Sequence, residues 1–186
     1  MGCDRDSPNL VLRHAQAALD ILVAADSRLY QIDALHNLGN AQLALGHWTA
    51  AQEAFERVEA LAREIDVSTK VPNALEGQAR LALTRGDLVM ALKVVQQLLD
   101  YVGDGGSAPS AGTLVGTEEH RIRLTLHEVW RRAQDPRAGA ALIEARRALM
   151  HEADAITDAV LRRSFLTQIP ENREIAALCE QSAKGG

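Results

Sequence analysis

Apolar residues recur at intervals of three and four along most of the chain, and this is the period of an amphipathic α-helix. No run alternates Val, Ile and Thr with polar residues, as a half-buried strand would. The apolar runs and the turn residues between them predict helices at 8–24, from after 27 to 46, at 49–64, from 72 to 86, from 87 onward, at 118–133, from 136 onward, at 158–166 and at 171–182. We therefore predict an all-α fold of about eight or nine helices.

The helices on either side of residue 46 carry the most specific packing pattern. Gly46 ends the first helix, and Ala51, Phe55 and Val58 then lie on one face of the second. Gly39 is placed where two antiparallel helices would touch most closely, which requires a small side chain. We expect Phe55 to fill the gap that the small residues leave, so that the two helices form a tightly packed hairpin.

The same spacing of small and large residues returns twice. Gly86 ends another helix 40 positions after Gly46, and Asp87 is a good N-cap for the next one. The residues that match the inward face of the first hairpin are Ala91, Val95 and Leu98, and farther on Ala138, Leu142 and Ala145. Repeat proteins stack copies of one supersecondary unit, so this recurrence predicts an array of hairpins.

The segment 34–61, ALHNLGNAQLALGHWTAAQEAFERVEAL, resembles one tetratricopeptide repeat (TPR), a helix–turn–helix unit of about 34 residues. The resemblance implies an all-α, right-handed superhelix of TPR-like hairpins, in which residues 8–186 form a single α-solenoid domain. The runs Arg162-Arg163-Ser164-Phe165-Leu166 and Pro170-Glu171-Asn172-Arg173 are similar to the end of the TPR region in large bacterial ATP-binding regulators. Those proteins carry LuxR-type or SARP-type DNA-binding domains, class III cyclases or, in some cases, protein kinases. None of these modules is present in the 186 residues, so their activities are not carried over.

Three segments are expected to depart from the regular array. Residues 1–7 are predicted to form a disordered leader, and residues 103–112, GDGGSAPSAG, a flexible loop. Residues 158–183 are predicted to cap the solenoid, whose end would otherwise expose an apolar face. The apolar face of this cap comprises Leu161, Phe165, Leu166, Ile175 and Leu178, and its polar face includes Arg162 and Arg163.

In TPR units the concave groove comes largely from the first helix of each hairpin. The resemblance therefore implies a partner-binding groove lined by His36, Asn40, Leu43, Glu76, Arg80 and Leu83. Asn40 would hold the backbone or a carboxylate of the ligand through its amide, and Arg80 would supply a charge. The alternative is that these residues are only the polar side of a helix, and the sequence does not choose between the two.

Charge and hydropathy argue against two classes of partner. The formal net charge of −5 and a pI near 5.7 leave no basic footprint for nucleic acid. No apolar run approaches the roughly 18 residues that a membrane span needs, and Asp6 stands where a myristoylation signal requires Ser or Thr. Cys3 and Cys179 make no disulfide framework, which suits a reducing, cytoplasmic location.

Catalytic and metal-binding patterns were not found in the sequence. The six histidines lack the His-Glu-x-x-His spacing of a zinc site, and His120 and His127 are expected to form a surface pair on one helix. There is no nucleophile elbow and no phosphate-binding loop. The arginine pairs at 131–132, 146–147 and 162–163 are interleaved with acids, so we expect them on a solvated, salt-bridged face. We predict no enzymatic activity, no cofactor and no metal.

Two functions remain open at this point. The first is a non-catalytic interaction or scaffold domain of a bacterial signalling or transcription-regulatory protein. It would bind a protein or peptide partner, or other domains of a larger regulator, as a monomer or weak homodimer. The alternative is a small-molecule effector-sensing domain of the same kind of regulator. An open groove would favour the first function, and a closed pocket lined by Trp and Arg would favour the second.

Overall fold

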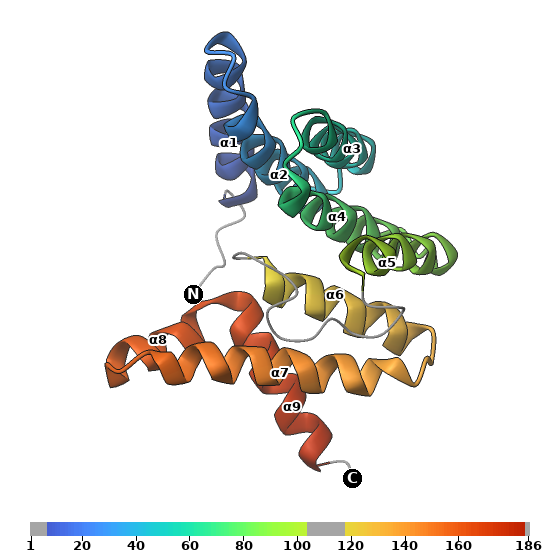
Figure 1. Cartoon of the computed structure of the whole chain (residues 1–186), viewed down its shortest axis with the longest axis vertical. Helices are drawn as coiled ribbons and strands as arrows, with labels where there is room; N and C mark the ends of the chain where they lie inside the picture. Colours follow the sequence, from blue (N-terminus) through green and yellow to red (C-terminus); the bar gives the residue numbers. More distant parts are fainter. Residues whose placement is uncertain (1–6, 104–117, 185–186) are drawn as a thin grey trace. The chain divides into compact units, whose positions relative to one another are not determined.

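The computed structural model describes residues 7–103 and 118–184, and within these ranges the chain is helical and contains no strand. The helices are α1 (Ser7–Ala24), α2 (Arg28–Ala44), α3 (Trp48–Glu64), a 3₁₀-helix (Ser68–Lys70), α4 (Val71–Thr84), α5 (Leu88–Val102), α6 (Glu119–Arg132), α7 (Arg137–Ala155), α8 (Ala159–Gln168) and α9 (Pro170–Lys184) (Figure 1). The predicted all-α class is confirmed. The predicted leader and the predicted loop at 103–112 lie almost wholly outside the described residues.

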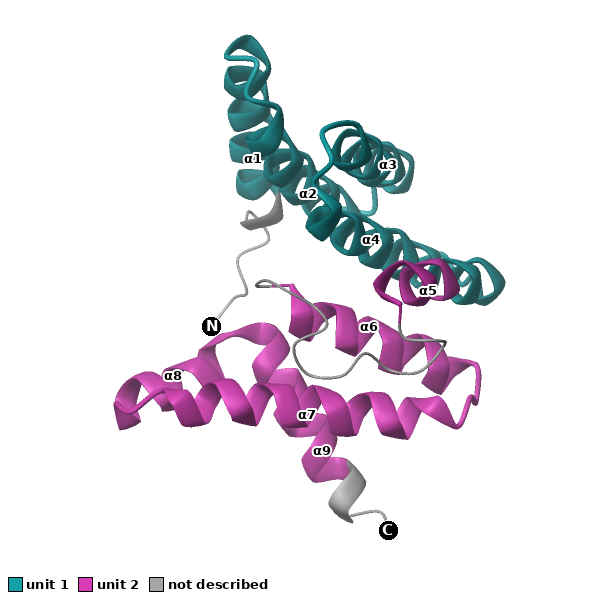
Figure 2. Ribbon diagram, in the orientation of Figure 1, with its two compact units in different colours: residues 1–94 teal, residues 95–186 magenta. Residues whose placement is uncertain are grey.

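The chain divides into two compact units, Met1–Val94 and Val95–Gly186, and the division falls within α5 (Figure 2). In the first unit α2 packs against α1 and α3, and α3 packs against α4. In the second unit α6 packs against α7, and α7 and α8 both pack against α9. Each unit has a hydrophobic core of its own. Nothing in the apolar pattern of the sequence had indicated this division.

The turns of the first unit recur every 20 positions. The residues with a left-handed backbone are Asp26, Gly46, Asp66 and Gly86. At Gly46 the backbone N–H donates to the carbonyl of Leu43 (3.1 Å), and the N–H of His47 donates to that of Gln42 (2.9 Å). The same pair of hydrogen bonds closes the helix at the other three positions. This pattern satisfies carbonyls that a helix end leaves unpaired, and the even spacing gives α2 and α3 equal lengths of 17 residues.

Phe55 is at the centre of the first core and is fully buried. A Cβ atom added to Gly39, on α2, would lie 2.6 Å from the ring, and one added to Gly77, on α4, would lie closer still. The ring therefore occupies the space that both glycines leave, and helices α2 and α4 can approach α3 only because these positions have no side chain. The expected match of Gly39 with Phe55 is confirmed. The equivalent contact from Gly77 was not predicted.

One apolar residue of α2 is less buried than its position on the helix predicts. Leu29 has helical spacing with Ile32 and Leu35, which are each 1% exposed, but Leu29 itself is 44% exposed. Because α2 begins at Arg28, Leu29 lies in its first turn. A helical period identifies the face of a residue but does not show whether the neighbouring helix reaches as far as the end of that face.

The second core is built around α7 and α9. Ile175 of α9 is fully buried against Leu124 of α6 and Leu149 of α7, and Phe165 and Leu178 pack against this cluster while half-buried. Four of the five residues predicted for the apolar face of this segment pack in the cluster, namely Phe165, Leu166, Ile175 and Leu178. The prediction for the fifth, Leu161, is wrong, because this side chain is 63% exposed in the first turn of α8.

Polar side chains stabilise the two connections that join α8 to α7 and to α9. Asp158 caps the helix by accepting hydrogen bonds from the N–H groups of Val160 (2.8 Å) and Leu161 (2.9 Å). Arg162 donates from Nε to the carbonyl of Ile156 (3.0 Å), in the turn after α7. Asn172 is fully buried at the start of α9 and donates to the carbonyl of Phe165 (2.9 Å). Arg162 and Asn172, two of the residues that carry the family resemblance, thus fix the connections on both sides of α8.

Candidate functional site

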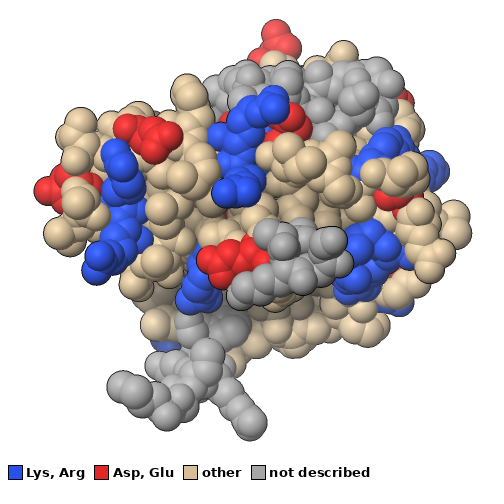
Figure 3. Space-filling view, turned by 90° about the horizontal axis from the view of Figure 1, so that it is seen from below, with Lys and Arg blue, Asp and Glu red and all other residues tan. Residues whose placement is uncertain are grey.

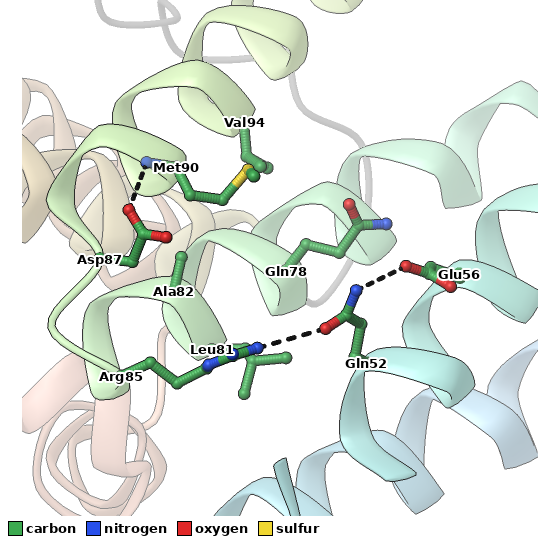
Figure 4. Close-up of a pocket in the computed structure, with 9 residues that line it drawn as sticks. All are labelled: Gln52, Glu56, Gln78, Leu81, Ala82, Arg85, Asp87, Met90 and Val94. Carbon is green, nitrogen blue, oxygen red and sulfur yellow. Dashed lines mark hydrogen bonds between the residues drawn. The ribbon is translucent and has the colours of Figure 1, made fainter. Parts of the chain in front are cut away.

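A cleft of about 430 Å³ lies in the first unit, between α3, α4 and the first half of α5 (Figure 4). It is lined by Gln52, Glu56, Gln78, Leu81, Ala82, Arg85, Asp87, Met90 and Val94. Five of these nine residues are exposed, so the cleft is open to solvent. Its position depends on the hairpin turn at Gly86, which brings the end of α4 and the start of α5 to its rim.

One wall of the cleft is polar, and its side chains are hydrogen-bonded in series. Arg85 Nη1 donates to Gln52 Oε1 (3.3 Å), and Gln52 Nε2 donates to Glu56 Oε1 (2.9 Å), as the row of sticks in Figure 4 shows. Gln78 donates from Nε2 to Glu59 Oε2 (3.0 Å), which ties α4 to α3. These bonds place two amides and one guanidinium in a definite arrangement along the cleft.

The side of the cleft formed by α5 is apolar at Met90 and Val94, which lie beside each other in Figure 4. Val94 is 4% exposed and Met90 44%, and Leu81 of α4, beside Arg85 in the figure, is 3% exposed. Asp87 caps α5, because its Oδ1 accepts a hydrogen bond from the N–H of Met90 (2.9 Å). A methionine side chain is flexible and polarisable, so this surface can adapt to apolar groups of different shapes.

The cleft has groups for binding but no obvious nucleophile. It contains no Ser, Cys or His among its lining residues. In the described part of the chain, no group of three or more His, Cys, Asp or Glu is placed to hold a metal ion. Cys179, in α9, is partly buried, and this burial raises the pKa of its thiol, although the charge of Arg146 opposes the shift. A raised pKa leaves little of the reactive thiolate at neutral pH.

The groove residues predicted from the sequence are partly brought together on α2 and α4. Arg80 donates to both carboxylate oxygens of Glu76 on its own helix, and its Nη2 also donates to Oδ1 of Asn40 on α2. The side chain of Arg80 is 31% exposed and that of Glu76 only 1%. The network therefore joins two helices that are adjacent in the first unit, and the amide oxygen of Asn40 is already engaged by Arg80.

The remaining predicted groove residues are buried. His36, Leu43 and Leu83 are each 7% exposed. Leu43 belongs to the core cluster around Phe55, and the ring of His36 lies 6.0 Å from that of Phe55. Such side chains offer little surface to a ligand. Of the six residues predicted to line the groove, only Asn40 and Arg80 remain accessible.

The cleft and the predicted groove occupy opposite faces of α4. Successive residues of an α-helix are turned by about 100°, which places Glu76 and Arg80 on one side of α4 and Gln78 and Arg85 on the other. No motif in the sequence distinguished Gln52, Gln78 or Met90 from other residues of polar and apolar helix faces. The Gly86-Asp87 turn was the one nearby signal, and it was interpreted as a helix boundary and as a second copy of the turn at Gly46, not as part of a binding site.

Two histidines of α6 differ from their predicted environment. His120 and His127 were expected to form a surface pair, but they are 7% and 8% exposed. His120 Nε2 lies 3.3 Å from Glu152 on α7, in ion-pair range but without hydrogen-bond geometry. His127 Nδ1 lies 2.9 Å from the carbonyl of Ala138, and since a carbonyl only accepts, this nitrogen carries the proton. Both histidines therefore join α6 to α7 instead of facing solvent together.

The arginine pairs do not form one basic surface. Arg131 and Arg132 both bind Glu128, at 2.8 and 2.6 Å, and Arg147 binds Glu144 at 2.9 Å. On the face shown in Figure 3, basic side chains form separate patches, several of them next to acidic ones. The salt bridges expected from the sequence are thus present at Arg131, Arg132 and Arg147, whereas Arg162 donates to backbone carbonyls.

None of the described helices is long and apolar enough to cross a bilayer. Comparison of the chain with protein-family models, with curated proteins and with solved structures finds no match.

Proposed function

We propose that this chain is a non-catalytic, TPR-like helical-hairpin domain that binds a segment of a protein partner. The hairpins α2–α3 and α4–α5 support this proposal, since their turns at Gly46 and Gly86 have the same conformation and the same hydrogen bonds. Phe55 packed between Gly39 and Gly77 further supports a repeated unit. A right-handed superhelix is the arrangement that we propose for the array.

The observation that carries the binding function is the open cleft between α3, α4 and α5. A peptide backbone presents N–H and C=O groups, which can pair with the amide oxygen of Gln78 and with further N–H groups of Arg85. An apolar side chain of the same peptide can rest on Met90 and Val94. Alternation of polar backbone contacts and an apolar anchor is typical of sites that bind extended peptides.

A protein segment is preferred to a small molecule for two reasons. Sites for small molecules enclose most of the ligand surface, whereas five of the nine residues that line this cleft are exposed. The lining includes Arg85 but neither tryptophan. Trp130 is completely buried and Trp48 is not among the lining residues.

The cellular context is proposed from the sequence resemblance alone. The segments 162–166 and 170–173 are similar to the end of the TPR region in bacterial ATP-binding regulators, so we propose a cytoplasmic role in signalling or in control of transcription. In that setting, occupation of the cleft would bias the activity of a protein joined to or bound by this domain. Its partner would be another protein, or another domain of the same regulator.

Selection of peptides from a displayed random library, followed by calorimetry with the full chain, tests the binding site. Met90→Glu places a charge on the apolar wall and should abolish binding of the selected peptides. Val89→Glu is the matched control, because Val89 precedes Met90 in α5, is 81% exposed and does not line the cleft.

The same peptides distinguish the cleft from the groove predicted on α2 and α4. Peptides that bind equally well after Met90→Glu, but lose affinity after Arg80→Ala or Asn40→Ala, would place the site on the opposite face of α4. If no peptide is selected and a small metabolite binds instead, the partner hypothesis is wrong.

A further inference from the structure

Helix α1 exposes large apolar side chains in addition to a polar strip. Its sequence, SPNLVLRHAQAALDILVA, contains two charged residues, Arg13 and Asp20. Ala15 and Leu19 are buried, and α1 packs on α2. Outside this contact, four large apolar side chains are exposed by about half or more: Leu10 (52%), Val11 (46%), Ile21 (69%) and Val23 (53%). Apolar side chains that are exposed next to one another on a helix commonly mark an interaction surface.

The exposed side of α1 has the spacing of a coiled-coil seam. Steps of four and three residues connect Leu10, His14, Ala17, Ile21 and Ala24. Because these positions are opposite to Ala15 and Leu19, they form a stripe on the face that points away from α2. Ala17 and Ala24 are small enough to let another helix come close.

The two charges of α1 flank this stripe on the same edge. Arg13 precedes His14, and Asp20 precedes Ile21, so both charges occupy the heptad position directly before a seam residue. When two such helices pair in antiparallel fashion, this edge of one helix faces the same edge of the other. Charges at these positions determine orientation and partner choice in coiled coils.

We propose that two copies of this chain associate through α1, in an antiparallel pair related by a two-fold axis. In one register, Leu10 packs against Ile21 of the second copy, and His14 packs against its Ala17. The same register places Arg13 opposite Asp20 of the second copy. The two-fold axis repeats each contact, so the surface is complementary to itself, as a symmetric dimer requires.

Charge complementarity selects the antiparallel arrangement. A parallel pair in register would place this charged edge against the opposite, apolar edge of the partner helix, which carries Val11 and Ala18. The antiparallel pair gives both charges an opposite partner, and Asp20, which accepts a hydrogen bond from Gln16 at 2.8 Å, already lies on the exposed surface. Both charged side chains can therefore meet their partners without becoming buried alone.

The proposed dimer is weak because a single helix of 18 residues is only about 27 Å long. Stable interfaces bury about 800 Å² on each partner, more than one such helix face offers. We expect dissociation in the micromolar range. His14 weakens the seam further, as a polar residue does at such a position.

Sedimentation velocity on the full chain, at concentrations from about 1 to 200 μM, tests the proposal. The wild-type chain should shift from monomer to dimer. Asp20→Arg and Arg13→Asp each place like charges opposite each other, and each should weaken the dimer by about tenfold or more. The double variant with both charges exchanged restores opposite pairs and should return to near the wild-type affinity.

Two further variants distinguish association through α1 from nonspecific association of exposed apolar residues. Ile21→Glu should abolish the dimer, whereas Val89→Glu, at an even more exposed apolar position on α5, should leave it unchanged. Circular dichroism checks that each variant is folded. A wild-type chain that stays monomeric over the whole range would overturn the proposal, and so would a double variant that dimerises no better than the single ones.

Discussion

The two units of this molecule differ in some of their helix connections. In the first unit, turns at Asp26, Gly46, Asp66 and Gly86 share a left-handed residue and the same pair of backbone hydrogen bonds. The second unit repeats this turn at Gln134, between α6 and α7. The connections on both sides of α8 are different, because Ile156 and Ile169 have extended backbones there. These two connections depend on the side chains of Asp158, Arg162 and Asn172.

The units also differ in how closely their cores are packed. The first core needs two glycines beside a fully buried phenylalanine, so its packing leaves almost no freedom. In the second unit the ring of Phe165 is half-buried, and α8 contains no buried residue. We infer that the first unit depends mainly on exact volume and backbone conformation, whereas the end of the second depends on polar contacts that fix the chain on both sides of α8.

The largest expected loss of stability comes from truncating the phenylalanine of each unit, and comparing the two losses tests this difference. Phe55→Ala should cost about 3–5 kcal/mol, because it empties a fully buried site. Phe165→Ala should cost about 1–2 kcal/mol, because its side chain is only half-buried. Urea unfolding followed by circular dichroism gives the cost, and hydrogen exchange shows which helices lose protection. Equal costs would remove the proposed difference between the cores.

Replacing a glycine by alanine should change the free energy of unfolding in opposite directions in the two units. Gly77→Ala puts a Cβ into the Phe55 ring and should destabilise the protein by about 1–3 kcal/mol. Gly139→Ala, within α7, meets no atom within 4 Å and should stabilise it by about 0.5–1 kcal/mol through helix propensity.

The cause of the Gly77 effect can be checked with a double variant. Phe55→Leu frees space next to Gly77, so the cost of Gly77→Ala should fall when both changes are combined. Simple addition of the two single costs would show that the glycine is not required by contact with the ring.

A smaller effect compares the helix starts of the two units. Asp158→Ala removes a side chain that caps α8 with two hydrogen bonds, and should cost about 1 kcal/mol. Ser27 occupies the N-cap position of α2 but makes no capping hydrogen bond, so Ser27→Ala should cost only a few tenths of that amount. Thermal unfolding of both variants measures the difference, and a costlier Ser27→Ala would contradict the assigned role of Asp158.

The smallest expected effect is the pH dependence of one ion-pair cluster in the second unit. Hydrogen bonds from Arg131, followed by burial that opposes them and a further hydrogen bond from Arg132, leave the pKa of Glu128 below its ordinary value of 4.5. A lowered pKa in the folded state means that the unfolded chain binds the proton more readily. The stabilisation is therefore present above pH 4.5 and is lost as the pH falls through the folded pKa.

Glu128→Gln removes that titration. Since the cluster is partly exposed, the variant should lose only a few tenths of a kcal/mol at pH 7. Its stability should change less than that of the wild type between pH 5 and pH 3, as measured by urea unfolding at each pH. A wild-type curve and a variant curve with the same acid slope would show that the cluster contributes nothing.

Much of the fold followed from the sequence alone. The helices, the turns at Gly46 and Gly86, and the contact of Gly39 with Phe55 depend on periodicity and on backbone conformation within short segments. The N-cap role of Asp158 depends on the same local physics, although the sequence had marked only a helix start there. Local signals of this kind do not require knowledge of which helices become neighbours.

The site depended on tertiary structure. Arg80 and Asn40 are 40 positions apart, and their hydrogen bond engages a group that the sequence assigned to a ligand. The cleft requires α3, α4 and α5 to meet, and only that meeting makes Gln78 and Met90 members of one surface. The sequence determined which face of each helix is apolar, but the packing of neighbouring helices decided which parts of each face stay open, because burial depends on atoms that are distant in the chain.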